Sequence, residues 1–198
     1  MSITVTRFPV IRCLLATAAA VLGIAAFSSA AQAACNYPDA EQVFSKWGDS
    51  RYYELAPDGG FEEGGTGWTF LGGAHLVAGN ESEYLNGGED DTALSLPYRG
   101  VAVSPRVCVD QNTPVFRLMA LNGGDNDAKL RVIVTYEMPY FKVRSTDIRA
   151  SNAWAPTDPL QFDTDGDRER VARISFTPRD AGGQWLVDDL YIDPFSRR

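Results

Sequence analysis

The chain has 198 residues, with 26 acidic side chains against 18 basic ones and a formal net charge of −8 at pH 7. A charge of this sign argues against nucleic acid and anionic lipid surfaces as partners. The chain has one histidine, which excludes a zinc site built from three histidines, and it has no dinucleotide or phosphate fingerprint before a helix pattern.

Residues 1–33 have the three zones of a signal peptide. Two arginines precede an apolar run over residues 13–27, and Ala31 and Ala33 place small side chains at the positions that signal peptidase reads. The run has about 15 residues, whereas a bilayer span needs about 20. We therefore expect this leader to be removed and the remaining chain to be secreted, either free or associated with the cell wall.

The leader removes two arginines and no acid, so the remaining 165 residues carry a formal charge of −10. A retained membrane anchor is the alternative for the apolar run. Lipidation of Cys35 is a second alternative, although a lipobox has leucine three residues before its cysteine, where this chain has Gln32. No later stretch is apolar enough to span a membrane, so we expect a mature form without a membrane partner.

Three cysteines become two when the leader is removed. Cys13 leaves with it, and Cys35 and Cys108 remain. An even pair in an oxidising compartment predicts a disulfide, and its long loop predicts a stabilisation of about 4 kcal/mol. Two free buried thiols are the alternative.

An N-terminal segment over residues 34–50 contains the one predicted helix, at 38–47. Pro38 suits the first position of a helix, and apolar side chains recur at helical spacing as far as Trp47. Gly48 would end this helix. We expect the disulfide to hold the segment against the rest of the domain.

Residues 51–198 read as short strands separated by turns rich in glycine, asparagine and aspartate. Apolar and polar side chains alternate clearly over residues 170–177. Many short strands with regular turns predict an all-β sandwich of a single domain. The predicted strands cover 52–55, 67–71, 74–78, 93–96, 101–103, 106–109, 115–121, 130–137, 141–145, 160–162, 170–177 and 184–192. The stretch 145–159 reads as a crossing loop.

Two segments at opposite ends of this region belong together. Residues 57–69 contain Gly-Gly-Phe-Glu followed by Gly-Trp, and residues 184–192 contain an Asp-Asp pair between apolar residues. The pair resembles the galactose-binding-like jelly rolls, in particular their carbohydrate-binding modules. The resemblance covers about residues 52–193 and implies a jelly-roll β-sandwich in which the first and last strands are neighbours.

The whole chain also resembles a group of secreted bacterial proteins of this type whose activity is uncharacterised. Besides an N-terminal cysteine segment, five short motifs carry this resemblance, at residues 72–74, 79–81, 94–97, 104–109 and 154–157. The resemblance supports the fold and implies no activity.

Many of the resembling modules hold a structural calcium ion between the first and last strands. The resemblance therefore implies a calcium site at Glu62 with Asp188 and Asp189, since calcium prefers carboxylate and carbonyl oxygens. Side chains alternate along a strand, so only one of the two aspartates should face inward, and the resemblance favours Asp189. The alternative is that these carboxylates only bind backbone amides at the edge of the sheet.

Aromatic side chains are the remaining candidates for binding a ligand, because sugar faces stack on aromatic rings. Trp68 and Trp185 lie in the fold motif and are expected in the core. A core stripe is also an alternative for Tyr136 and its neighbours. The candidates for sugar contact are Tyr84, Tyr98, Tyr136, Tyr140, Phe141 and Trp154.

The sequence therefore predicts a secreted, monomeric and non-catalytic carbohydrate-binding module with a structural calcium ion and no other cofactor. An extracellular structural or protein-interaction domain without a sugar site is the alternative. A hydrolase built from two converging carboxylates is a third hypothesis. His75 is the only histidine and no Gly-x-Ser-x-Gly motif is present, so a serine-histidine triad is disfavoured.

Overall fold

A computed structural model describes residues 39–88, 90–110, 115–163 and 169–193. The predicted signal peptide and Cys35 lie outside the described residues. Within these ranges no helix combines the length and the apolar character needed to cross a membrane.

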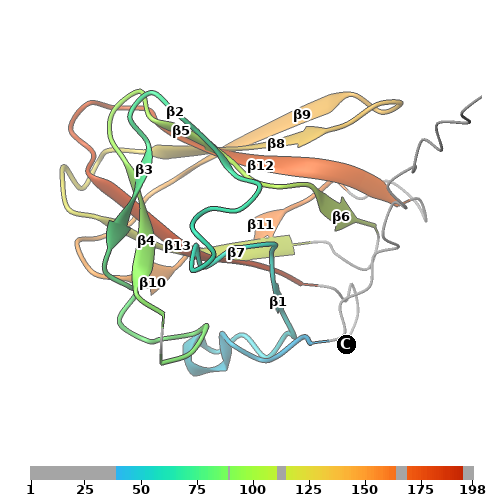
Figure 1. Cartoon of the computed structure of the whole chain (residues 1–198), viewed down its shortest axis with the longest axis horizontal. Helices are drawn as coiled ribbons and strands as arrows, with labels where there is room; N and C mark the ends of the chain where they lie inside the picture. Colours follow the sequence, from blue (N-terminus) through green and yellow to red (C-terminus); the bar gives the residue numbers. More distant parts are fainter. Residues whose placement is uncertain (1–38, 89, 111–114, 164–168, 194–198) are drawn as a thin grey trace, which may run out of the picture. The chain divides into compact units, whose positions relative to one another are not determined.

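The described chain is an all-β jelly-roll sandwich of two antiparallel sheets (Figure 1). The seven-stranded sheet has the order β10-β7-β13-β4-β3, with β1 pairing with β13 and β11 pairing with β7. Its strands are β1 (Glu54–Leu55), β3 (His75–Ala78), β4 (Thr92–Leu96), β7 (Val115–Asn122), β10 (Ala155–Pro156), β11 (Leu160–Gln161) and β13 (Trp185–Ile192).

The six-stranded sheet has the order β2-β5-β12-β8-β9, with β6 also pairing with β12. Its strands are β2 (Thr69–Leu71), β5 (Val101–Val103), β6 (Val107–Val109), β8 (Leu130–Tyr136), β9 (Lys142–Ile148) and β12 (Arg170–Pro178). Each predicted strand is present with small shifts at its ends. β10 was not predicted, because Pro156 and the turn-forming residues around it indicate a loop and not a strand.

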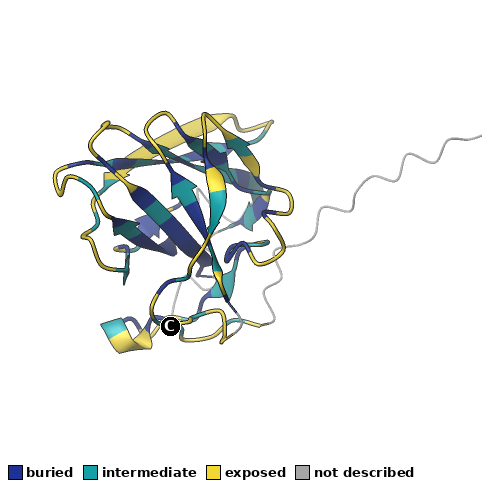
Figure 2. Cartoon of the chain, turned by 60° about the vertical axis from the view of Figure 1, so that its left-hand side comes forward, coloured by how far each residue is buried: buried dark blue, intermediate teal, exposed yellow. Residues whose placement is uncertain are grey.

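The core lies between the two sheets, where buried strands are enclosed by exposed loops (Figure 2). On β12 the alternation is as predicted, because Ala172, Ile174 and Phe176 are fully buried while their neighbours are half-buried. Trp68 stacks on Phe176 with 6.1 Å between ring centroids, and Trp185 is also buried. Burying a large apolar side chain stabilises the fold by about 1.5–3 kcal/mol, which explains why both tryptophans are in the core.

The first and last strands are neighbours, as the resemblance implied. Glu54 of β1 pairs with Ile192 of β13, and Leu55 pairs with Tyr191. Segments more than 130 residues apart are therefore joined in one sheet.

The predicted N-terminal helix is wrong over the residues that the structure describes. Only one 3₁₀ turn, η1 (Ser45–Trp47), is present. The backbone of Glu41 exchanges two hydrogen bonds with Tyr53, so it is extended and pairs like a strand. The apolar spacing reflects a turn that buries Phe44, and Gly48 ends this turn in a left-handed conformation with φ 79°.

Residues 39–53 pack against the outward face of β7 and β13 in the seven-stranded sheet. Phe44 and Tyr53 form a second apolar cluster with Val115, Met119 and Tyr191 of β7 and β13. Trp154 and Leu85 pack against the same cluster. This cluster extends the buried part of the domain beyond the space between the sheets.

Cys108 lies on β6, where it is half-buried. Its predicted partner, Cys35, lies outside the described residues, so the disulfide stays a prediction.

Candidate functional site

A bulge in β13 places the Asp-Asp pair. Asp188 pairs with Met119 and Tyr191 pairs with Arg117, so β13 has one more residue than β7 between these points. Asp189 takes up the difference with φ 51°, and both aspartates are fully buried. A bulge interrupts the alternation of a strand, and Asp188 pairs with Met119 of the outward-facing cluster. The expectation that only one of the two aspartates faces inward stays a prediction.

The Gly-Gly pair of the first motif packs directly against this bulge. The Leu190 N–H donates to the carbonyl of Gly59 at 3.0 Å, and the Ala56 N–H donates to the Leu190 carbonyl at 2.8 Å. A Cβ atom at residue 59 would lie 2.6 Å from the Leu190 oxygen, and one at residue 60 would lie 3.3 Å from Oδ1 of Asp189. The close packing between the two motifs therefore requires glycine in the first motif, because only glycine allows the backbones to approach this closely.

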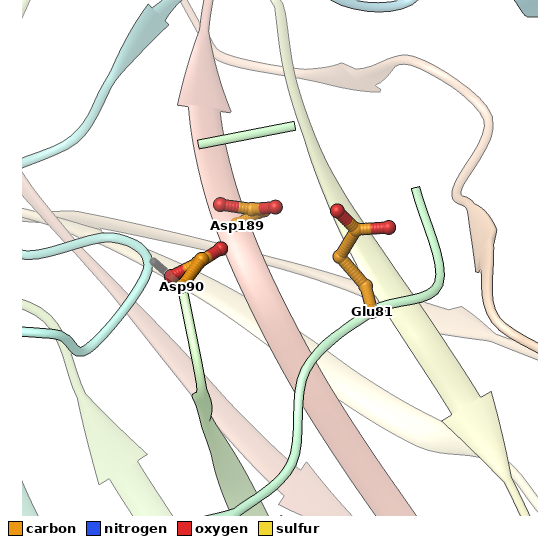
Figure 3. A group of neighbouring side chains, drawn as sticks. All are labelled: Glu81, Asp90 and Asp189. Atoms are coloured by element: carbon orange, nitrogen blue, oxygen red, sulfur yellow. The ribbon is translucent and has the colours of Figure 1, made fainter. Parts of the chain in front are cut away.

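Three buried carboxylates converge beside the bulge. Glu81 follows β3, Asp90 precedes β4 and Asp189 belongs to β13, and their carboxylates point towards a common space (Figure 3). One carboxylate oxygen from each residue lies within 4.8 Å of the other two. We call these residues the carboxylate cluster.

Neither oxygen of Asp189 and neither oxygen of Asp90 accepts a hydrogen bond of normal geometry from a described residue. Burial, with the charges of Asp90, Glu81 and Glu62, raises the pKa of Asp189 to about 8. Burial and the contact with Glu62 raise the pKa of Asp90 to about 7, and burial also raises the pKa of Glu81. Buried carboxylates that accept no such hydrogen bond cost free energy when charged, so protonation of Asp90 and Asp189 or a bound cation would stabilise the cluster.

The donor set of the carboxylate cluster fits calcium. Calcium takes six to eight oxygens at about 2.3–2.6 Å, so one ion can touch three oxygens that lie within 4.8 Å of one another. Side chains of Asn80 and Asn86 face Asp90, and the Asn80 amide is buried without a hydrogen-bond partner among the described residues. Magnesium is a poorer fit, because it demands regular octahedral geometry and keeps several waters.

The structure brings Asp189 into the cluster but places Glu62 and Asp188 beside it. Oε1 of Glu62 accepts the backbone N–H groups of Asp91 and Thr92 at 3.0 and 2.8 Å, as the alternative reading of this residue predicted. Oδ1 of Asp188 accepts the N–H of Asp189 at 2.9 Å. Burial and the charges of Asp189 and Asp90 raise the pKa of Asp188 to about 9.

Glu81 and Asp90 were not chosen as ligands from the sequence. Glu81 ends the Gly-Asn-Glu motif at residues 79–81, and Asp90 lies in a run of three acidic residues at 89–91. The missing information was the path of residues 79–91, which return to the bulge of β13. The Glu81 carboxylate also holds this loop, because it accepts the N–H groups of Glu83 and Leu85 at 2.5 Å.

The predicted aromatic ligand residues fall into two groups. Tyr84, Tyr98 and Tyr140 are exposed by 42–55%, and Phe141 by 70%. Tyr136 is fully buried with its hydroxyl bonded to the N–H of Asp163, so the core alternative is correct for this residue. Trp154 is half-buried in the second apolar cluster.

A pocket of about 480 Å³ lies where β4, β7 and β13 approach their loops, within the size range of small-ligand sites. Tyr98 is 45% exposed at this pocket, and the Arg99 guanidinium lies 5.5 Å from the centre of its ring. Polar side chains of Ser95 and Gln184 line it together with apolar Leu121 and Leu186. The pocket therefore offers one aromatic face, apolar surface and hydrogen-bonding groups.

Comparisons with known proteins give similarities in structure only. The sequence matches no protein-family model, and no curated protein matches it significantly. The solved structures to which the chain is similar include TmCBM61 in complex with beta-1,4-galactotriose, at 18% identity and a TM-score of 0.45, covering 70% of this chain and 96% of that chain.

Two others are xylan-binding. One is the xylan-binding domain from CBM 22, at 15% identity and a TM-score of 0.47, covering 76% of this chain and 99% of that chain. The other is the CBM22-1 xylan-binding domain from Paenibacillus barcinonensis Xyn10C, at 14% identity and a TM-score of 0.46, covering 67% and 88%. The identities are too low for the ligands of those proteins to be transferred to this chain.

Proposed function

We propose that this chain is a secreted, non-catalytic carbohydrate-binding module whose fold is held together by a calcium ion. The observation that carries the sugar-binding part is the pocket beside Tyr98. A flat exposed ring next to hydrogen-bonding side chains is the combination that sugar recognition needs, because sugars present apolar C–H faces and hydroxyl edges. The leader and the motif pair in the sequence support export and this class of module.

The observation that carries the calcium part is the carboxylate cluster. Glu81, Asp90 and Asp189 would supply carboxylate oxygens to the ion, and the amide oxygen of Asn80 is a neutral candidate beside them. The ion would join the loop after β3, the start of β4 and the bulge of β13, so its role would be structural.

A glycan array and pull-downs on insoluble polysaccharides test the sugar-binding part. We expect binding to at least one plant, fungal or bacterial glycan, and Tyr98→Ala should abolish it. Phe141→Ala is the matched control, because this ring is 70% exposed on the β8–β9 hairpin and does not line the pocket. Absence of binding across all the glycans would overturn the sugar-binding part.

Thermal melting with calcium and with chelator tests the calcium part. We expect the Tm to be higher with calcium, because a ligand that binds only the folded state stabilises it. An unchanged Tm would overturn the calcium part of the proposal, and it would have no bearing on the sugar-binding part.

A protein-interaction domain without a sugar site is the second candidate. The exposed aromatic rings of the described residues lie in three loops, with Tyr140 and Phe141 together on the β8–β9 hairpin, and not in a row along one sheet face. The β8–β9 hairpin instead carries Met138, Phe141 and Val143, which are exposed by 77%, 70% and 52%. Exposed apolar side chains in a group favour contact with another protein. Failure of every glycan to bind would favour this candidate.

A further inference from the structure

The sequence contains two Asn-Gly pairs, and their asparagines differ in burial and in hydrogen bonding. Asn86 is exposed in the loop between β3 and β4, whereas Asn122 is fully buried at the end of β7. Asn122 makes three side-chain hydrogen bonds. Its Oδ1 accepts the N–H groups of Gly124 and Gln184 at 3.1 and 3.0 Å, and its Nδ2 donates to the carbonyl of Asp125 at 2.7 Å.

Asn86 lies beside the carboxylate cluster. Its amide faces the carboxylate of Asp90. Its Nδ2 atom would lie 2.7 Å from a Cβ atom at residue 60, so it lies against the Gly-Gly segment that contacts the bulge. The next residue, Gly87, has φ 116°, and a Cβ atom there would meet nothing within 4 Å. The backbone after Asn86 is therefore open to solvent on the side where a side chain would stand.

We propose that Asn86–Gly87 is a site of spontaneous deamidation and that its product adds a fourth carboxylate to the edge of the carboxylate cluster. The backbone nitrogen of Gly87 attacks Cγ of Asn86 and forms a cyclic imide. The side-chain nitrogen leaves as ammonia and takes the proton of the Gly87 amide. Water then opens the imide at either carbonyl carbon and leaves aspartate or isoaspartate, with no oxidation or reduction.

Glycine favours the attack, because it has no side chain to obstruct ring closure and because its backbone adopts unusual torsion angles at little cost. The Gly87 N–H donates one hydrogen bond, to the carbonyl of Tyr84 at 3.1 Å, and this bond must open first. At the second pair, the Gly123 N–H is bonded to the carbonyl of Gln184 at 2.9 Å, and the Asn122 amide must also leave its three partners. The structure thus protects Asn122 and leaves Asn86 reactive.

The product changes the charge where a cation would bind. A neutral amide that faces Asp90 becomes a carboxylate, so the cluster and its neighbours gain one negative charge. A further carboxylate increases attraction for a divalent cation and increases repulsion in its absence. Deamidation would therefore tighten calcium binding while making the calcium-free form less stable. This consequence rests on the proposed calcium site, whereas the deamidation does not.

Peptide mapping of the mature protein during storage at mildly alkaline pH tests the modification. We expect the mass change of NH₂ to OH at Asn86 about a hundredfold faster than at Asn122, from the three side-chain hydrogen bonds that Asn122 must break. Gly87→Ala should slow the change at Asn86, and Asn122 is the internal control. Equal rates at the two asparagines, or no conversion at Asn86, would overturn the proposal.

Calcium titrations of Asn86→Asp, which reproduces the aspartate product, test the consequence for the cluster. We expect its half-saturating calcium concentration to fall several-fold and its Tm in chelator to drop below that of the wild type. Calcium affinity equal to that of the wild type would overturn the link between the modification and the cluster. If the wild type does not respond to calcium, the calcium site fails, and the mapping result still decides whether Asn86 deamidates.

Discussion

The Nη1 atom of Arg117 lies 2.8 Å from Oδ2 of Asp49, and these side chains are only 7% and 8% exposed. The Tyr53 hydroxyl donates to the same Asp49 oxygen at 2.8 Å, and Nε of Arg117 donates to the carbonyl of Thr157 at 2.7 Å. The Arg117 guanidinium also lies 4.6 Å from the centre of the Phe44 ring. This buried pair fastens the N-terminal segment to the outward face of β7.

Breaking this pair should destabilise the fold strongly. Asp49→Asn leaves the Arg117 charge buried without its partner, and such a change costs about 3–5 kcal/mol. Urea unfolding followed by tryptophan fluorescence measures it. The control is Asp147→Asn, which removes a pair of the same 2.8 Å length to Arg131 at a more exposed site and should barely move the midpoint. Equal losses in the two variants would contradict the role given to burial.

The same carboxylate predicts a pH dependence. Burial alone would raise the pKa of Asp49, but hydrogen bonds from Tyr53, the Arg51 backbone and Arg117 outweigh it and hold this pKa below its ordinary value of 3.8. The stability that Asp49 contributes is therefore complete above its unfolded pKa and is lost as the pH falls through its folded pKa. We expect the stability difference between wild type and Asp49→Asn to shrink below about pH 4. A difference that stays constant down to acid unfolding would refute this.

Asp189→Asn should have opposite effects with and without calcium. In chelator the folded wild type must either protonate the buried Asp189 carboxyl or keep its charge without a cation, and both cost free energy. The amide of the variant avoids this cost, so its Tm should exceed that of the wild type. With calcium it lacks a ligand, so its Tm should lie below the wild-type value. Asp91→Asn is the control in the neighbouring loop, since Asp91 is exposed and lies outside the cluster. If calcium changed the Tm of Asp189→Asn and of the wild type by the same amount, the result would count against a cation at this site.

Gly59→Ala should cost stability through backbone displacement. The added Cβ atom would lie 2.6 Å from the carbonyl oxygen of Leu190, which belongs to β13 and cannot move without disturbing the bulge. Forcing extra atoms into a packed region costs about 1–3 kcal/mol. The control is Gly88→Ala, where a Cβ atom would meet nothing within 4 Å. Differential scanning calorimetry of both variants measures the difference, and equal Tm values would be the contrary result.

Thiol titration of the unfolded, unreduced protein should find no free thiol, because we expect Cys35 to pair with Cys108. Reduction should then lower the free energy of unfolding by about 4 kcal/mol. Two free thiols in each chain would disprove the disulfide.

The strands were predictable because their alternation and the glycine turns between them are local properties of the sequence. Residues 101–103 were predicted as a strand with the bounds that the structure has. The pairing of the first and last strands came from the resemblance. The N-terminal helix failed because the backbone partner of Glu41 is Tyr53, a contact that helical spacing cannot reveal.

The candidate site was predicted only in part. Asp189 was identified because the motif pair marks its strand. Glu81 and Asp90 were missed as ligands because they converge through a loop whose path is set by packing, including that of Leu85 against the second cluster. Tyr136 was named as a ligand residue because its alternation fits a rim and a core equally well, and only the opposing sheet decides between them.

β9 ends the six-stranded sheet, and all of its residues except Ile148 are exposed. Among the described strands it pairs with β8 alone, so one row of its backbone N–H and C=O groups faces outward. Such a row can template the growth of fibrils from one molecule to the next. Lys142, Arg144 and Asp147 interrupt it with charges, and long charged side chains along an edge oppose the docking of another strand. We therefore expect the charge pattern of β9 to oppose polymerisation of the protein through its own sheet.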